Sequence, residues 1–382
     1  MKEKSQFEKN AADKQVELLS EALNGAVSAG GHWLNATGKG YPKFYPKGVA
    51  VSPFNALFMA LHSDKTGSKT NLFTLYSEAK ARGESVREHE KGVPFLFYNW
   101  NKYVNRNNPN DIISRNDYQQ LPPEERNRYK GIHNREIRTL FTIDQTLLPL
   151  VDKNVYETLV QKHGNSVEQG FGEKELRELR PRFNAFVQAI SKNMVPIRTD
   201  GSGVAHYDSQ KDAVYIPRQK DFEHYTDYAQ ETLRQIIAAT GHQQRLAREG
   251  MVMKNGVPPT EDAVKQEHLI SEIASGIKML EMGLPARLSD ENIKMVDYWS
   301  RELKENPCLI DAIESDVNNA LEVIRKAERG EKIEYATYRN HRQTERMQEQ
   351  MPKHFFVADE IKKHPDKDNK TIVLVIDRQG KS

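Results

Sequence analysis

The first part of the chain mixes segments of helical and of strand periodicity. Apolar positions recur every three or four residues in three stretches, which predict helices at 1–28, 53–63 and 74–83. Two apolar runs of strand length predict neighbouring strands at 93–100 and 136–146. The segment between them, 101–135, is almost wholly polar, so we expect it to leave the fold and return. The pattern predicts a small α+β domain over residues 1–150.

The later part of the chain has a different pattern. After a polar, helix-prone linker at 151–200, two short strands around a turn predict a β-hairpin at 204–217. Helical spacing then dominates and predicts a helix within 228–246 that ends at Gly241, followed by helices at 261–283, 290–305 and 307–329. We therefore expect a mainly helical domain with a short β-sheet over 201–329, and an α+β fold class for the chain.

A charged tail, 330–382, follows the last predicted helix. It contains the strand-like run "TIVLVID" at 371–377. This run predicts either the start of a further module or a partner strand for an existing sheet.

Composition excludes several protein classes. Charged residues make up 29% of the 382, but 14 Phe, 15 Tyr and 3 Trp argue against wholesale disorder. Cys308 is the only cysteine, so neither a disulfide framework nor a Cys-rich zinc site is possible. The N-terminus lacks the apolar core of a signal peptide, and no run of about 18 apolar residues occurs. We expect a soluble, cytoplasmic protein.

Charge is distributed unevenly along the chain, although the net charge is only +2. From His32 to Asn107, eleven basic residues stand against five acidic ones, a balance of +6. From Thr260 to Gly330, nine basic residues stand against fifteen acidic ones, a balance of −6. The chain thus joins a basic N-terminal half to an acidic C-terminal half.

The segment 33–60 combines cations with aromatic residues and contains no acid. Its basic and aromatic members are Lys39, Lys43, Lys47, Trp33, Tyr41, Phe44 and Tyr45. Cations that follow phosphates and aromatic rings that stack on bases are what a single-stranded nucleic-acid site needs. The pattern alone leaves open a second interpretation, in which the aromatics fill the core and the lysines form a solvated rim.

The helix at 228–246 occupies a place where zinc hydrolases carry H-E-x-x-H. The matching positions here are Arg234, Gln235 and Ala238. A guanidinium has no lone pair for a metal, an amide does not titrate, and alanine offers no ligand atom. His242, beyond the end of this helix, and the i,i+4 pair His268 and Glu272 are the remaining candidate ligands. They are either polar groups that satisfy helix ends or the ligands of a divergent metal-dependent hydrolase.

Six segments of the chain occur in the order found in one known family. They are "PFNALFMAL" (53–61), "TLYSEAKARGESVREHEKGVPFLFY" (74–98), "RTLFTIDQT" (138–146), "HYDSQKDAVYIP" (206–217), "TLRQIIAATGHQQRLAR" (232–248) and "QEHLISEIAS" (266–275). Together they resemble the ArdC-type antirestriction proteins of plasmids and conjugative elements. In that family a single-stranded-DNA-binding domain precedes a zincin-like metallopeptidase domain. The insertion 101–135 and the tail fall outside the resemblance.

The resemblance also shows what this chain lacks. It places the family's two zinc histidines at Arg234 and Ala238 and its general base at Gln235, while Thr240-Gly241-His242, Arg245, Leu246 and Glu272 match. It therefore implies a catalytically inactive zincin-like domain. We predict no catalytic residue, no metal and no cofactor, with His242, His268 and Glu272 as residual metal candidates.

For the N-terminal domain the resemblance favours the DNA interpretation. The predicted contacts are Trp33, Lys39, Tyr41, Lys43, Phe44, Tyr45, Lys47, Arg82, Arg87 and Lys91. The implied role is to protect incoming DNA of a mobile genetic element from host restriction during conjugation. The competing hypothesis is a protein-interaction module whose acidic second domain binds a restriction enzyme or a DNA-transfer protein.

Overall fold

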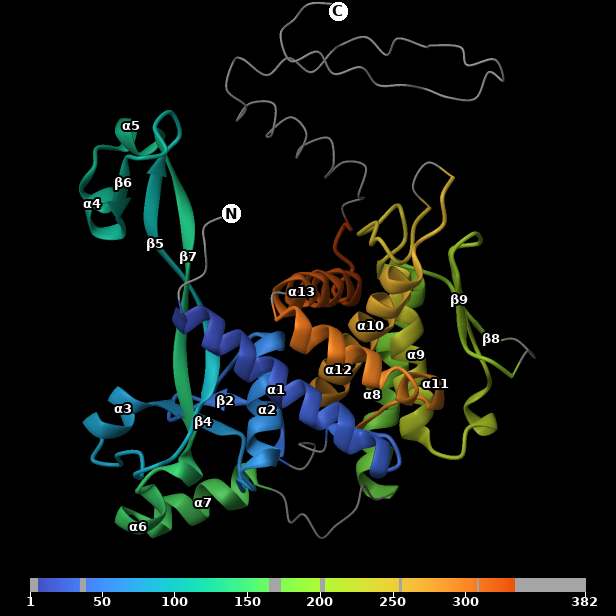
Figure 1. The fold of residues 1–382 in the computed structure, drawn as a ribbon, viewed down its shortest axis with the longest axis horizontal. Helices are drawn as coiled ribbons and strands as arrows, with labels where there is room; N and C mark the ends of the chain where they lie inside the picture. The colour runs from blue at the N-terminus through green and yellow to red at the C-terminus, as the bar shows by residue number, and fades with distance from the viewer. Residues whose placement is uncertain are drawn as a thin grey trace, which may run out of the picture. The chain divides into compact units, whose positions relative to one another are not determined.

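The computed structural model describes residues 6–34, 39–164, 173–199, 203–253, 256–307 and 309–333 (Figure 1). All the described residues belong to one compact unit. The predicted strand 371–377 lies outside the described residues. The structure does not test the predicted domain boundaries, which stay predictions. Within the described residues, no helix is both long enough and apolar enough to cross a bilayer.

The N-terminal part is built around a six-stranded mixed sheet with the order β3-β2-β4-β7-β5-β6. Its strands are β2 (Lys43–Phe44), β3 (Val49–Ala50), β4 (Leu72–Leu75), β5 (Val93–Asn105), β6 (Ile112–Ser114) and β7 (Tyr129–Thr142). The helices of this part are α1 (Gln6–Ser28), α2 (Pro53–Lys65) and α3 (Tyr76–Ala81). The predicted helix 74–83 therefore begins later than expected, because its first residues belong to β4.

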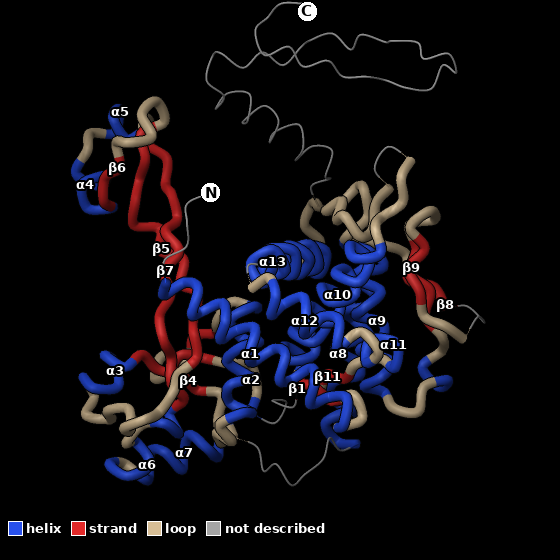
Figure 2. The backbone as a smooth tube through the Cα atoms, viewed as in Figure 1, coloured by secondary structure: helices blue, strands red, loops and turns tan. Residues whose placement is uncertain are grey.

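The polar insertion 101–135 is an ordered arm (Figure 2). Strands β5 and β7 pair from Val93↔Leu140 outward to Asn105↔Tyr129, with one irregularity between Asn99 and Lys102. The short helices α4 (Arg115–Gln120) and α5 (Pro123–Arg126) lie beyond β6 at the tip. The excursion thus stays hydrogen-bonded, because each outgoing strand residue finds a partner on the returning strand.

The C-terminal part combines a three-stranded sheet with a helical layer, which confirms the predicted α+β class. The sheet has the order β8-β10-β9, from β8 (Ile197–Thr199), β9 (His206–Asp208) and β10 (Ala213–Ile216). The predicted hairpin is β9–β10, with Ala213 paired to Asp208. The helices are α9 (Tyr225–Thr240), α10 (Glu261–Met282), α11 (Asp290–Ile293), α12 (Val296–Glu305) and α13 (Leu309–Glu328).

Between the two sheets the chain is helical, as the linker composition predicts. It contains the 3₁₀ turn η2 (Ile143–Gln145) and the helices α6 (Leu148–Val151), α7 (Lys153–His163) and α8 (Glu173–Asn193). A second 3₁₀ turn, η3 (Gln219–Asp221), precedes α9.

The first residues of the chain share one hydrophobic core with its last described helices. Strand β1 (His32–Leu34) pairs with β11 (Ala286–Arg287), about 250 residues later in the chain. Leu19 and Leu23 of α1 belong to the same buried cluster as Trp299 of α12. The amphipathic face of α1 therefore lies against α12 and not only against the N-terminal sheet.

Candidate functional site

Helix α9 presents two different faces. Leu233, Ile236 and Ile237 are fully buried, whereas Gln235 and Ala238 lie on a half-buried face. The helix ends at Gly241, whose N–H donates to the Ala238 carbonyl (2.9 Å). A Cβ at Gly241 would lie 2.9 Å from the Arg248 guanidinium, so only glycine allows this approach. The predicted end of the helix at Gly241 is confirmed.

Arg234 of α9 forms a bidentate ion pair with Glu272 of α10. Its Nε lies 2.8 Å from Glu272 Oε2, and its Nη2 lies 3.1 Å from Glu272 Oε1. The remaining nitrogen, Nη1, donates to Glu231 Oε2 at 2.7 Å. Nη2 also donates to the carbonyl of Arg287. Each of the three guanidinium nitrogens thus donates to a carboxylate, and Nη2 donates to a backbone oxygen as well.

Glu272 is completely buried and its oxygens are hydrogen-bonded on several sides. Besides Arg234, it accepts from Asn292 Nδ2 at 2.7 Å and from Gln230 Nε2 at 3.4 Å. Gln235 does not reach Glu272; its Nε2 donates to Glu231 Oε1 at 2.7 Å. From the sequence, Arg234 is recognisable only as a position that offers no metal ligand. Its pairing with Glu272 was missed because 38 residues separate the two.

The electrostatics favour a permanent charge at Arg234. Burial opposes the charged form, but the carboxylates of Glu272 and Glu231 outweigh it and raise the pKa of the Arg234 guanidinium. A buried carboxylate is stable in its charged form only next to a cation. Arg234 supplies that cation from within the chain.

A pocket of about 320 Å³ opens beside this ion pair. Arg234, Gln235 and Ala238 line it together with His268 and Glu231. The structure therefore brings the three degenerate positions to one concave surface.

His242 belongs to a different cluster. It is buried, and its Nδ1 accepts from the Gln244 N–H at 3.3 Å. Burial lowers the pKa of His242, Asp212 opposes this, and Arg245 adds to the lowering. Arg245 itself donates to Asp212 Oδ2 at 3.0 Å and to the Ala239 carbonyl at 2.7 Å. His242 thus faces the β9–β10 hairpin rather than Glu272.

Arg248 links α9 and α10 through a second buried ion pair and through hydrogen bonds. Its Nε lies 2.8 Å from Glu267 Oε2, and its Nη2 donates to the Ile237 carbonyl at 2.9 Å. Its Nη1 donates to Thr240 Oγ1 at 2.7 Å. The segment after α9 is therefore held by arginines whose partners lie on the hairpin and on α10.

The structure divides the predicted DNA contacts into buried and exposed residues. Trp33 is only 3% exposed, and its ring lies over Gly276, where an added Cβ would be 2.4 Å from Cζ2. Trp33 therefore cannot stack on a base, and this prediction is corrected: its ring fills the core. The rings of Tyr41 and Phe44 are half-buried against the same core.

Three of the predicted cations are neutralised by carboxylates, and a fourth is not. Lys39 is paired with Asp64 (3.2 Å), Arg82 with Glu84 (2.9 Å) and Arg87 with Glu90 (2.6 Å). Lys91 is exposed and has no carboxylate partner within the described residues.

The other two predicted cations, Lys43 and Lys47, lie on the β2–β3 hairpin on either side of Tyr45 in the sequence. Lys47 is exposed and Lys43 half-exposed, and neither pairs with a described carboxylate. The Arg82 guanidinium lies over the Tyr45 ring at 4.8 Å, and the Tyr45 hydroxyl donates to Glu84 Oε1 at 3.3 Å. The ring is therefore held in place by its neighbours.

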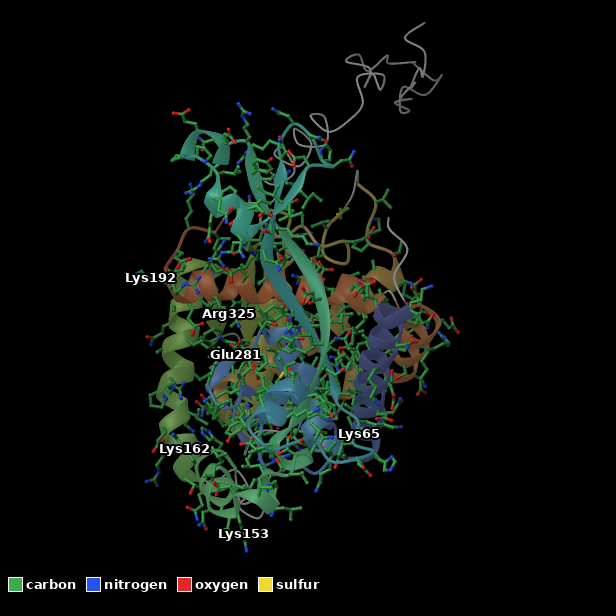
Figure 3. The ribbon with its side chains drawn as sticks, turned by 90° about the vertical axis from the view of Figure 1, so that its left-hand side faces the viewer. Lys65, Lys153, Lys162, Lys192, Glu281 and Arg325 are labelled. Atoms are coloured by element: carbon green, nitrogen blue, oxygen red, sulfur yellow. The ribbon has the colours of Figure 1, made fainter. Side chains whose placement is uncertain are left out.

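Helix α7 adds a cation that sequence analysis did not include. Burial lowers the pKa of His163, and the charges of Lys43 and Lys162 lower it further. Both lysines therefore lie near His163, and Lys162 is exposed (Figure 3). Lys162 was missed because α7 follows the predicted domain, and only the fold brings Lys43 near the end of α7 at His163.

Comparison with protein families identifies both parts of the chain. Residues 9–140 match the N-terminal domain of anti-restriction factor ArdC, and residues 181–314 match a zincin-like metallopeptidase. The two matches occur in the order found in ArdC. The chain belongs to the ArdC-type family. No curated protein matches it.

Two solved structures of the antirestriction ArdC protein from the R388 plasmid have the same fold as this ArdC-type chain. The metal-free structure is 21% identical, covers 83% of this chain and 99% of its own, and has a TM-score of 0.52. The Mn(II)-bound structure is 20% identical, covers 82% of this chain and 97% of its own, and has a TM-score of 0.54. At this identity the likeness concerns the fold.

The residues of this ArdC-type chain do not fit a zincin metal site. Glu272, the acidic position that matches the family, accepts two hydrogen bonds from the Arg234 guanidinium. Ala238 has no ligand atom, and Gln235 is bound to Glu231. Among the described residues, no three His, Cys, Asp or Glu side chains gather where they could hold a metal ion. We therefore derive no metal-dependent step.

Proposed function

We propose that this ArdC-type chain binds single-stranded DNA through its N-terminal part and acts in the cytoplasm as an antirestriction-like factor of a mobile genetic element. The observation that supports it best is the group of three unpaired cations around the β2–β3 hairpin. Family membership supplies the biological setting, in which transferred DNA meets host restriction. The hairpin supplies the chemistry.

The cations Lys43 and Lys47 belong to the β2–β3 hairpin, and Lys162 belongs to the end of α7, where its neighbour His163 lies near Lys43. Strand β3 is the outermost strand of the six, so the hairpin that carries Lys47 lies at one edge of the sheet. Each cation can neutralise one phosphate without first breaking an ion pair. Tyr45 lies between Lys43 and Lys47 and offers a ring on which a base can stack, at roughly 1–3 kcal/mol per base.

The proposal assigns a smaller role to Lys39, Arg82 and Arg87, because each is already neutralised by a carboxylate. Arg82 instead positions Tyr45 through its contact with the ring. Lys91 remains a further phosphate contact in this proposal.

For the zincin-like part we propose a metal-free scaffold without peptidase activity. Arg234 supports this proposal, since its guanidinium supplies the positive charge that the buried Glu272 requires. The divergent hydrolase that would use His242, His268 and Glu272 is less well supported. Glu272 is occupied by Arg234 and Asn292, and His242 faces the hairpin.

A salt titration on a single-stranded oligonucleotide tests the DNA proposal. The slope of log affinity against log salt for the native chain should flatten by about 2 in K43Q/K47Q/K162Q, at about 0.7 per phosphate on a single strand. K192Q/K220Q/K294Q removes the same charge from exposed lysines of the C-terminal part and should keep the native slope. Absent binding at low salt, or equal slopes in both variants, would overturn the proposal.

A further inference from the structure

The arm formed by β5 and β7 carries four cations that the proposed single-strand site does not use. They are Lys102, Arg106, Arg128 and Lys130. All four are exposed, and none forms an ion pair with a described carboxylate. Lys102 lies in β5 and Lys130 in β7, while Arg106 directly follows β5 and Arg128 directly precedes β7.

The register places Lys102 and Lys130 on one face of the ribbon, with the buried Val104 and with Ile132 between them, and this face continues to Arg106 and Arg128 just beyond the strand ends. Lys102 pairs with Ile132, and Val104 pairs with Lys130. Directly opposed residues of an antiparallel pair share a face, and every second residue along a strand shares it too. The Arg106 N–H donates to the Arg128 carbonyl at 2.7 Å, which continues the same register. We call Lys102, Arg106, Arg128 and Lys130 the cationic face.

The opposite face of the ribbon is occupied by the arm's own residues. Tyr103 stacks on Tyr118 of α4 with ring centroids 3.7 Å apart. The Tyr129 hydroxyl donates to Asp111 Oδ2 at 2.8 Å, and Asn105 donates to the same oxygen at 2.8 Å. The aromatic rings of the outer arm are thus used for internal packing.

The acids of the arm leave the cationic face unneutralised. Asp111 is bound by Tyr129 and Asn105, and Asp117 caps α4 through Ser114. Glu124 and Glu125 lie in the first turn of α5, where the helix dipole favours negative charge. A concentrated positive strip without a partner acid is complementary to a polyanion.

The shape and composition of the cationic face distinguish duplex from single-stranded nucleic acid. Lys102 and Arg106 are four residues apart, about 13 Å along a strand, and the two strands are about 4.8 Å apart. Strand β6 pairs with β5 along Lys102–Val104, so the arm is three strands wide there. The major groove of B-DNA is about 12 Å wide, so cations at the two ends of the strip can reach phosphates on both sides of the groove. Tyr103 and Tyr129 point to the other face, so the cationic face has no ring on which an unpaired base could stack.

We propose that the cationic face of the arm binds the phosphate backbone of double-stranded DNA. Together with the proposed function, this inference predicts that the preferred ligand is a duplex that continues into a single strand. Only this prediction about the preferred ligand rests on the proposed function. The duplex lies on the arm and the single strand on the β2–β3 hairpin. Binding at the arm is largely electrostatic and independent of base sequence.

The test compares the full-length chain with two variants of equal charge on duplex and single-stranded oligonucleotides. The arm variant is K102Q/R106Q/R128Q/K130Q, and the control is K192Q/K220Q/K294Q/K304Q, whose lysines are exposed elsewhere. On duplex DNA, the salt slope of the arm variant should be shallower than the native slope by about 3 to 4, at about 0.9 per phosphate. The control should keep the native slope. R106Q/R128Q alone should give about half the change, which guards against misfolding of the quadruple variant.

The same oligonucleotides separate this inference from the proposed function. If the arm variant binds duplex DNA with native affinity and slope, or the native chain binds no duplex at low salt, the arm inference is overturned. Loss of single-strand binding in K43Q/K47Q/K162Q with intact duplex binding supports two separate surfaces. If the native chain binds duplex through the arm but no single strand, the proposed function fails and the arm inference stands.

Discussion

Arg234 and Glu272 face each other between α9 and α10, with Nε 2.8 Å from Oε2 and Nη2 3.1 Å from Oε1. Glu272 is fully buried, and Arg234 is 8% exposed. A carboxylate in such a place is costly unless a cation balances it, and a zincin would provide zinc for that purpose. Here Arg234 provides the cation, and Asn292 adds a further hydrogen bond to the same buried carboxylate.

The first prediction concerns this ion pair. R234M removes the charge but keeps a long side chain, which leaves Glu272 buried without its cation. We expect the free energy of unfolding to fall by about 3–5 kcal/mol. Urea unfolding at neutral pH followed by circular dichroism measures it.

An exposed ion pair provides the control for R234M. Arg218 pairs with Asp221 at 3.0 Å, but its side chain is 62% exposed. R218M should therefore cost only about 0–1 kcal/mol. The double variant R234M/E272M should recover most of the loss, because no uncompensated charge remains. A loss for R234M no larger than that for R218M would contradict the buried-pair interpretation.

The second prediction concerns metal. R234H/Q235E/A238H rebuilds H-E-x-x-H on α9 and frees Glu272 from its guanidinium. Because Ala238 borders a pocket of about 320 Å³, the new histidine has room. We expect the variant to bind one zinc ion per chain by elemental analysis after dialysis, and the native chain to bind none. Stoichiometric zinc or manganese in the native chain would contradict the proposed metal-free scaffold.

The third prediction tests the position of Trp33 with two glycines inside helices. A Cβ at Gly276 would lie 2.4 Å from the Trp33 ring, whereas a Cβ at Gly25 of α1 meets nothing within 4 Å. G276A should destabilise the chain by about 1–3 kcal/mol through overpacking. G25A should stabilise it by about 0.5–1 kcal/mol through helix propensity. Thermal or urea unfolding of both variants decides, and stabilisation by G276A would contradict the buried position of Trp33.

The fourth prediction concerns pH. Burial lowers the pKa of His62, although its contact with Gln145 Oε1 (3.1 Å) opposes the shift. The unfolded chain then binds the proton more readily than the folded one. The contribution of His62 to stability is complete above its unfolded pKa of about 6.5 and is lost as the pH falls towards the folded value.

Urea unfolding between pH 8 and pH 5 measures the effect of His62. H62Q should show a smaller loss of unfolding free energy on acidification than the native chain. Parallel pH profiles for the two proteins would show that His62 is not the responsible group.

Local pattern was sufficient for most elements of the fold. Helix α10 was predicted at 261–283 and is Glu261–Met282, and the hairpin predicted at 204–217 is β9–β10. Apolar periodicity involves residues only a few positions apart, so it can be recognised directly in the sequence. The paired strands of the arm were not predicted. Their polar residues form strands only because they pair with a segment some 25 residues away in the chain.

What the sequence determined by itself about the site is chemical. Arg234, Gln235 and Ala238 cannot form a zincin metal site in any fold, because side-chain type decides which atoms can ligate or titrate. The tertiary structure decided what these and other residues do instead. It pairs Arg234 with Glu272, buries Trp33 over Gly276 and places Lys43 near His163 of α7. Each of these relationships joins residues far apart in the chain, and only folding, which brings such segments within contact distance, creates them.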